Sequence, residues 1–161
     1  MSRRKLIRLK EAVIAEGREY VTVNPMAVTL TCKKARHEPS GVAYLNLYRA
    51  SENLKHFRKK LNQKLGHRRK TIGFFAVTEK DSSGRYHHHL CIERPEEIDD
   101  RYLKFLIWQV WRSTDWGMPV IDVQDGSDPR WISYMCKLRS KEVWDEAIDW
   151  INCHRSRLAE I

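Results

Sequence analysis

Glu79, His87 and His89 have side chains that can ligate metal ions, and they lie on either side of one polar turn. The segments that flank this turn, 72–79 and 86–92, are rich in β-branched and aromatic residues and predict a β-hairpin. A three-residue loop with glycine at its last position sets Glu79 opposite His87. Because side chains alternate between the faces of a strand, both histidines share a face with Glu79. Two imidazoles and one carboxylate leave coordination positions open, as a catalytic divalent cation requires.

His88, between the two histidines of this pair, is predicted to point to the opposite face. There it would meet the helical layer, where a neutral, hydrogen-bonded imidazole is tolerated. A His-x-His pair is weak evidence by itself, since a chain with seven histidines has roughly a one-in-three chance of containing one. The alternative is a histidine-rich exposed strand, and Glu79 on the neighbouring strand favours the metal site.

Tyr134 and Lys137 form a second candidate group. A helix is predicted to begin near Asp128, a suitable N-cap, and it would place Tyr134 and Lys137 on one face. Trp131 and Lys141 lie along the same stripe and are candidate DNA contacts. A phenol becomes a useful nucleophile only if its proton is removed or its anion is stabilised. The alternative is a tyrosine and a lysine that merely lie side by side on the surface.

The elements that would position these groups follow from hydrophobic spacing. They are a helix at 3–16 that ends near Gly17, a strand at 26–32, a helix at 51–65 that Gly66 ends, the hairpin, a helix to about 113 with Tyr102, Leu103, Leu106 and Val110 inward, a strand at 120–124, the helix of Tyr134, and a last helix with Val143, Ala147, Ile148 and Ile151 inward. This order predicts an α+β fold, in which helices cover one face of an antiparallel sheet of four to five strands. The other face would be open and would carry the site.

Composition favours one domain over residues 1–161 and a polyanionic partner. The chain is 42% hydrophobic, and its formal net charge is +9. The outer side of the helix at 51–65 is basic, so Arg58, Lys59 and Lys64 are candidate DNA contacts. The basic segment within residues 1–24 is either an arm that lies on DNA or a packed first helix.

The four cysteines indicate an intracellular protein. They are widely spaced and form no Cys-x-x-Cys pair, which is typical of reduced core residues. No signal peptide begins the chain, and no apolar run reaches the ~18 residues of a membrane span. We therefore expect a soluble protein in the cytoplasm of a host cell, with no membrane partner.

Three motifs in this order resemble those of the HUH-type rolling-circle replication initiators. The first is the strand at 28–31, the second is His87-His88-His89-Leu90, and the third is the helix with Tyr134 and Lys137. The resemblance spans residues 28–137 and implies a ferredoxin-like sheet related to that of RRM domains. One departure is His88, which replaces an apolar residue of the family motif. The helix has no second tyrosine, so the resemblance is to single-tyrosine members.

The resemblance implies a metal-dependent endonuclease that starts rolling-circle replication of a plasmid or phage. Tyr134 would attack single-stranded or hairpin origin DNA and become joined to the 5′ phosphate. Mg²⁺ or Mn²⁺ would be held by Glu79, His87 and His89, and Lys137 would stabilise negative charge. The sequence has no Gly-x-x-x-x-Gly-Lys-Ser/Thr motif, so we expect a separate or host helicase and a polymerase as partners.

Three alternatives stay open at this point. A tyrosine transposase of the HUH class would share all of these site residues. A non-catalytic nucleic-acid-binding module would carry aromatic residues on the open face of the sheet, where Phe75 is the one good candidate. A structural zinc protein is the least favoured, because no cysteine joins the cluster.

Overall fold

The computed structural model describes residues 2–66, 69–124, 130–136 and 147–158. In chain order its elements are α1 (Arg3–Tyr20), β1 (Pro25–Cys32), β2 (Ala35–Glu38), β3 (Gly41–Tyr44), α2 (Leu47–Lys64), β4 (Arg69–Thr71), β5 (Phe74–Lys80), β6 (Tyr86–Glu93), α3 (Asp100–Arg112), β7 (Gly117–Gln124), α4 (Arg130–Met135), the 3₁₀ turn η1 (Trp150–Asn152) and β8 (Arg157–Leu158).

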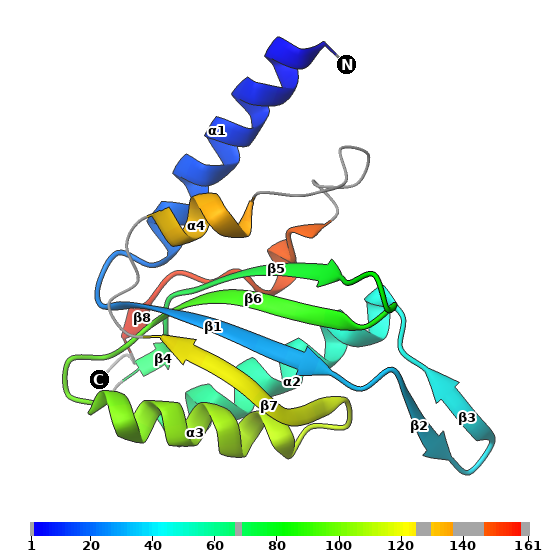
Figure 1. Cartoon of the computed structure of the whole chain (residues 1–161). Coiled ribbons are helices and arrows are strands. Elements are labelled where there is room, and N and C mark those ends of the chain that lie inside the picture. Colours follow the sequence, from blue (N-terminus) through cyan, green and yellow to red (C-terminus); the bar gives the residue numbers. More distant parts are fainter. Residues whose placement is uncertain (1, 67–68, 125–129, 137–146, 159–161) are drawn as a thin grey trace.

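The main sheet has four antiparallel strands in the order β5-β6-β1-β7 (Figure 1). β2 and β3 form a separate hairpin that extends from the end of the sheet, and β4 pairs with β8. The predicted α+β class and the predicted antiparallel sheet of four to five strands are therefore confirmed.

Helices α2 and α3 cover one face of this sheet (Figure 1). Phe57 of α2 meets Trp111 of α3 edge to face, with ring centroids 5.6 Å apart, and both rings are buried. Alternate apolar residues of the strands, such as Leu30 and Leu90, are fully buried, as expected for a strand with one face in the core. Helices α1 and α4 lie on the other side of the sheet, so the face predicted to be open is partly covered.

Gly17 lies inside α1 and does not end it, contrary to the sequence prediction. The helix continues to Tyr20. A Cβ atom at Gly17 would lie 3.0 Å from side-chain atoms of both Ile132 and Phe75. Glycine at this position therefore lets α1 approach α4 and β5 closely, and close packing here outweighs its low helix propensity.

The segment after residue 146 follows the edge of β5. Ile148 is buried as predicted and forms a bridge with Val77, whereas Ile151, also predicted to face inward, is 69% exposed. Backbone hydrogen bonds explain the difference, because the amide of Asp149 donates to Ala76 instead of continuing a helix. Residues 143–146 of the predicted last helix lie outside the described residues.

Two smaller expectations have clear outcomes. The four cysteines are free and buried, as predicted for core residues. Tyr102 is 49% exposed and does not join the inner stripe of α3, unlike Leu103, Leu106 and Val110.

None of the helices that the structure describes is both long enough and apolar enough to span a bilayer.

Candidate active site

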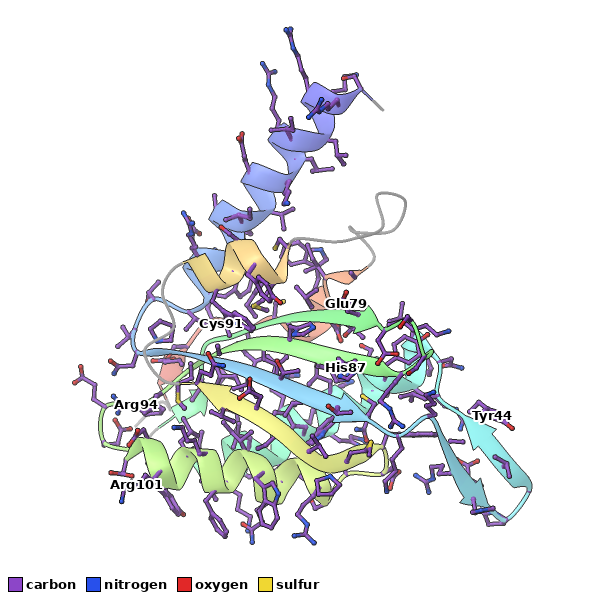
Figure 2. All side chains as sticks on the ribbon, in the orientation of Figure 1. Tyr44, Glu79, His87, Cys91, Arg94 and Arg101 are labelled. Atoms are coloured by element: carbon purple, nitrogen blue, oxygen red, sulfur yellow. The ribbon has the colours of Figure 1, made fainter. Side chains whose placement is uncertain are left out.

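The hairpin has the predicted register. Glu79 of β5 pairs with His87 of β6, and both lie near the turn (Figure 2). On the other side of β6, strand β1 places Thr31 opposite His87 and Thr29 opposite His89. Cross-strand partners share a face, so these five side chains gather on the side of the sheet away from α2 and α3.

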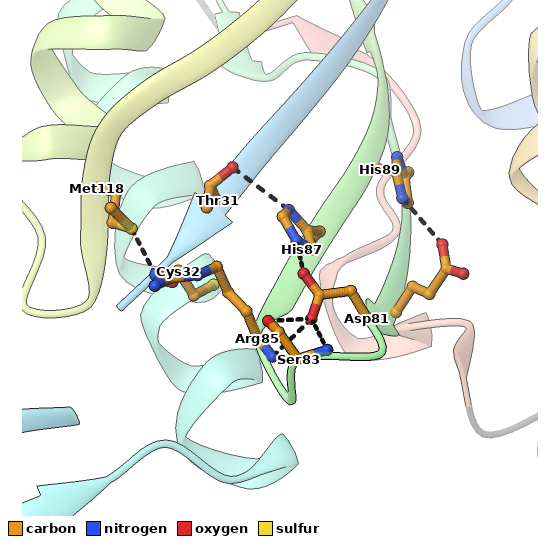
Figure 3. Close-up of polar contacts among 9 residues, drawn as sticks. Thr31, Cys32, Asp81, Ser83, Arg85, His87, His89 and Met118 are labelled. Atoms are coloured by element: carbon orange, nitrogen blue, oxygen red, sulfur yellow. Dashed lines mark hydrogen bonds and ion pairs between the residues drawn. The ribbon is translucent and has the colours of Figure 1, made fainter. Parts of the chain in front are cut away.

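His87 is held at both ring nitrogens (Figure 3). Its Nε2 lies 2.8 Å from Oδ2 of Asp81, and its Nδ1 lies 3.3 Å from the hydroxyl of Thr31. The carboxylate that contacts His87 is therefore that of Asp81 and not that of Glu79, although Glu79 is its backbone partner.

His89 has the same arrangement one step along the strand. Its Nε2 lies 3.1 Å from Oε2 of Glu79, and its Nδ1 lies 3.3 Å from the hydroxyl of Thr29. Glu79 thus reaches diagonally across the hairpin, a distance that a long side chain covers easily. Burial lowers the pKa of His89, and the negative charge of Glu79 counteracts part of this effect.

Asp81 lies in the polar turn and is a site residue that the sequence pattern did not predict. Its Oδ1 accepts hydrogen bonds from the hydroxyl and amide of Ser83 and from the amide of Arg85, at 2.6 to 3.0 Å. The bonds from the Ser83 hydroxyl and from His87 lower the pKa of Asp81 below its ordinary range. The turn therefore fixes a charged carboxylate beside His87. Glu79 and Asp81 are two residues apart, as are His87 and His89. This matching spacing is the sequence feature that could have identified Asp81 as a second carboxylate of the site.

His88 points to the opposite face, as predicted. It is fully buried, its Nδ1 lies 2.8 Å from the hydroxyl of Thr78, and its ring meets the edge of Trp111 at 5.7 Å. Its Nε2 has no hydrogen-bond partner among the described residues, and the backbone of Ala50 raises the pKa of His88 by less than burial lowers it. Burial, together with the neighbouring histidines, lowers the pKa of His88 to about 3. His88 is therefore a neutral core residue.

Helix α4 places Trp131 and Tyr134 beside this face. The indole N–H of Trp131 donates to the carbonyl of Leu90 on β6 at 2.9 Å. Its ring contacts His89 edge to face at 6.3 Å and stacks on Tyr134 at 5.2 Å. Tyr134 itself is 57% exposed. The structure thus connects the predicted nucleophile to the strand of the histidines through one tryptophan.

The predicted basic contacts have different outcomes. Lys141, a predicted DNA contact, and Lys137, predicted to stabilise negative charge, lie outside the described residues. Arg58 is only 7% exposed, and its Nε lies 3.4 Å from Oδ1 of Asn152, so the proposed DNA contact is corrected to a buried link between α2 and η1. Lys59 and Lys64 are exposed, but α2 lies on the face of the sheet opposite His87 and His89.

The donor atoms of this face are of the types that bind divalent cations. The two Nε2 atoms and the carboxylates of Glu79 and Asp81 suit a metal that takes mixed nitrogen and oxygen ligands. Thr29 and Thr31 hold the two Nδ1 atoms, as partners of metal-bound histidines commonly do. The donors are engaged in two separate His–carboxylate pairs, and no three His, Cys, Asp or Glu side chains of the described residues are grouped to hold an ion. Metal binding would therefore require these pairs to open.

Comparison with protein families gives the class of the protein. Residues 25–143, well over half of the chain, match the family described as replication-associated protein ORF2. The chain belongs to this family of replication-associated proteins, which points to a role in replication initiation with DNA as its partner. The match includes the four strands of the main sheet and α4, and therefore both parts of the candidate site. No curated protein and no solved structure matches the chain.

Proposed function

We propose that this protein is a replication initiator that nicks and rejoins single-stranded origin DNA through Tyr134. The observation that supports this most directly is the position of α4. Its tryptophan is hydrogen-bonded to β6 and contacts both His89 and Tyr134. An exposed phenol thus lies on the helix that is fixed beside two His–carboxylate pairs, in a chain of a replication-associated family.

Tyr134 would be the nucleophile of a transesterification. Its oxygen loses the phenolic proton and forms a bond to phosphorus, while the bond from phosphorus to the 3′ oxygen breaks. The 3′ oxygen takes a proton and becomes a free hydroxyl that a polymerase can extend. Attack by a new 3′-hydroxyl reverses the step and releases Tyr134, so one site performs both nicking and joining.

The two histidines, Glu79 and Asp81 would hold Mg²⁺ or Mn²⁺. When it is bound, such an ion neutralises charge on a phosphate oxygen. The residues of the chain prepare the site in two ways. Thr29 and Thr31 contact Nδ1 and thereby orient the rings, and the turn keeps Asp81 deprotonated and in place. Lys137, next on the predicted helix face, would stabilise the phenolate.

A covalent protein–DNA adduct tests this proposal. Purified protein is incubated with a pool of single-stranded oligonucleotides labelled at the 3′ end, with Mn²⁺ or with EDTA, and separated on a denaturing gel. We expect an Mn²⁺-dependent adduct that Tyr134→Phe abolishes. Tyr48→Phe is the matched control, because Tyr48 is also exposed but lies on α2. An adduct at the normal yield in Tyr134→Phe would assign the nucleophile to another residue.

A further inference from the structure

The N-terminal half of α1 carries a concentration of positive charge that the proposed nicking site does not use. Four of its five cations are exposed and Lys10 is half-buried. Their side chains form no hydrogen bond or ion pair with any residue that the structure describes. These cations are Arg3, Arg4, Lys5, Arg8 and Lys10. In contrast, Glu16 and Glu19 at the other end of the helix pair with Arg155.

The C-terminal half of α1 is attached to the helix of the candidate nucleophile. Gly17 lies against Ile132, and the guanidinium of Arg18 donates to the hydroxyl of Ser133 at 3.4 Å. Beyond this contact α1 projects past α4, away from the sheet (Figure 1), and its side chains extend on several sides (Figure 2). The cationic half is therefore held at a fixed direction from Tyr134.

The cations occupy two sides of the helix. At about 100° per residue, Arg3 and Lys10 fall on one side, and Arg4, Lys5 and Arg8 fall roughly opposite. Residues 3 to 10 span about 10 Å along the axis at 1.5 Å per residue. A single polynucleotide strand could follow only one of these sides. The two phosphate backbones that border a groove of duplex DNA can neutralise both.

We propose that the N-terminal half of α1 binds the major groove of duplex DNA next to the single strand at Tyr134. An α-helix of about 10–12 Å diameter fits a major groove about 12 Å wide. The substrate would then be a stem with a single-stranded segment, in which α1 contacts the stem. This inference rests on the proposed function only for the place of the single strand.

Binding of a tailed hairpin, compared with its tail alone, tests this inference. Arg3, Arg4 and Arg8 are replaced together by glutamine, which keeps helix propensity nearly unchanged. Affinities are measured by fluorescence anisotropy in EDTA over a range of salt concentrations. Three lost phosphate contacts at about 0.9 each should lower the slope of log affinity against log salt by roughly 2.7 for the hairpin. We expect at least tenfold weaker hairpin binding at low salt and tail binding within twofold of the original protein.

The matched control replaces Lys59, Lys60 and Lys64 on α2, on the far face of the sheet, with glutamine. It removes the same amount of positive charge, and it should change the affinity for the tailed hairpin and for the tail alone by the same factor. An equal loss for hairpin and tail in the α1 variant, or a selective hairpin loss in the α2 variant, would overturn the inference. This binding experiment requires neither metal nor nicking. A failure to detect any Tyr134 adduct would therefore count against the proposed function alone, and the comparison of hairpin and tail would still test the role of α1.

Discussion

Replacing Thr29 or Thr31 with valine removes the hydroxyl that holds Nδ1 of His89 or His87, while it keeps the shape of the side chain. Partners of this kind change metal affinity by about 10- to 100-fold, or roughly 1.4–2.7 kcal/mol. Both hydroxyl contacts are 3.3 Å long and only partly buried, so water can replace them in the metal-free protein. We therefore expect weaker Mn²⁺ binding and a change in the free energy of unfolding below about 1 kcal/mol.

Thr78 offers the opposite case on the same hairpin. Its hydroxyl makes an equivalent bond to Nδ1 of His88, but this bond is 2.8 Å long and buried in the core. Thr78→Val leaves a buried imidazole nitrogen without its partner. A loss of about 2 kcal/mol is expected, which lowers the unfolding temperature by roughly 4–8 °C for a protein of this size. Mn²⁺ affinity should stay unchanged, because His88 faces away from the site.

Two measurements separate these outcomes. Isothermal titration calorimetry gives the Mn²⁺ affinity, and thermal unfolding followed by far-UV circular dichroism in EDTA gives the stability. Thr29→Val and Thr31→Val should alter the first quantity, and Thr78→Val should alter the second. The reasoning is refuted if Thr78→Val weakens Mn²⁺ binding as much as Thr29→Val and Thr31→Val do. It is also refuted if neither Thr29→Val nor Thr31→Val changes the Mn²⁺ affinity by more than twofold.

Three further predictions concern single residues. Asp81→Asn should reduce Mn²⁺-dependent nicking at least tenfold, although a turn aspartate without a site role would leave the rate unchanged. His88 has a pKa near 3 in the fold and 6.5 as its ordinary value, so the unfolded chain takes up the proton first as pH falls. The contribution of neutral His88 to stability is complete above pH 6.5 and is lost progressively below it. The unfolding temperature should therefore fall as the pH is lowered from 7 to 5, and His88→Leu should make the unfolding temperature less dependent on pH. Arg58→Gln should lower the unfolding temperature and leave the salt dependence of DNA binding unchanged, because Arg58 is buried against Asn152; a shallower salt slope would restore it as a DNA contact.

Local rules were sufficient for the hairpin and for the direction of its histidines. The turn at 81–85 sets the register, and strand alternation then determines that His88 is buried while His87 and His89 are not. The side-chain partners were harder to predict, because either Glu79 or Asp81 can reach His87 and the choice depends on how Ser83 holds Asp81.

Contacts between distant segments were the main source of error. Helical spacing gave no sign that Arg58 would be buried, since η1, almost a hundred residues later, covers it. Gly17 has the sequence properties of a helix end, and only its neighbours Ile132 and Phe75 explain why the helix continues. Neither contact can be predicted from the residue pattern of a single helix or strand.

The contact at Gly17 also bears on how this domain is assembled from parts. The family match begins at residue 25, so α1 lies outside it, whereas Ile132 lies within it on the helix of Tyr134. An element beyond the shared region therefore supports the apolar side of α4, where Ile132 and Met135 are buried. Transplanting residues 25–143 alone into another protein would expose that apolar side. The portable unit of this protein is thus larger than the segment that defines its family, and it includes α1.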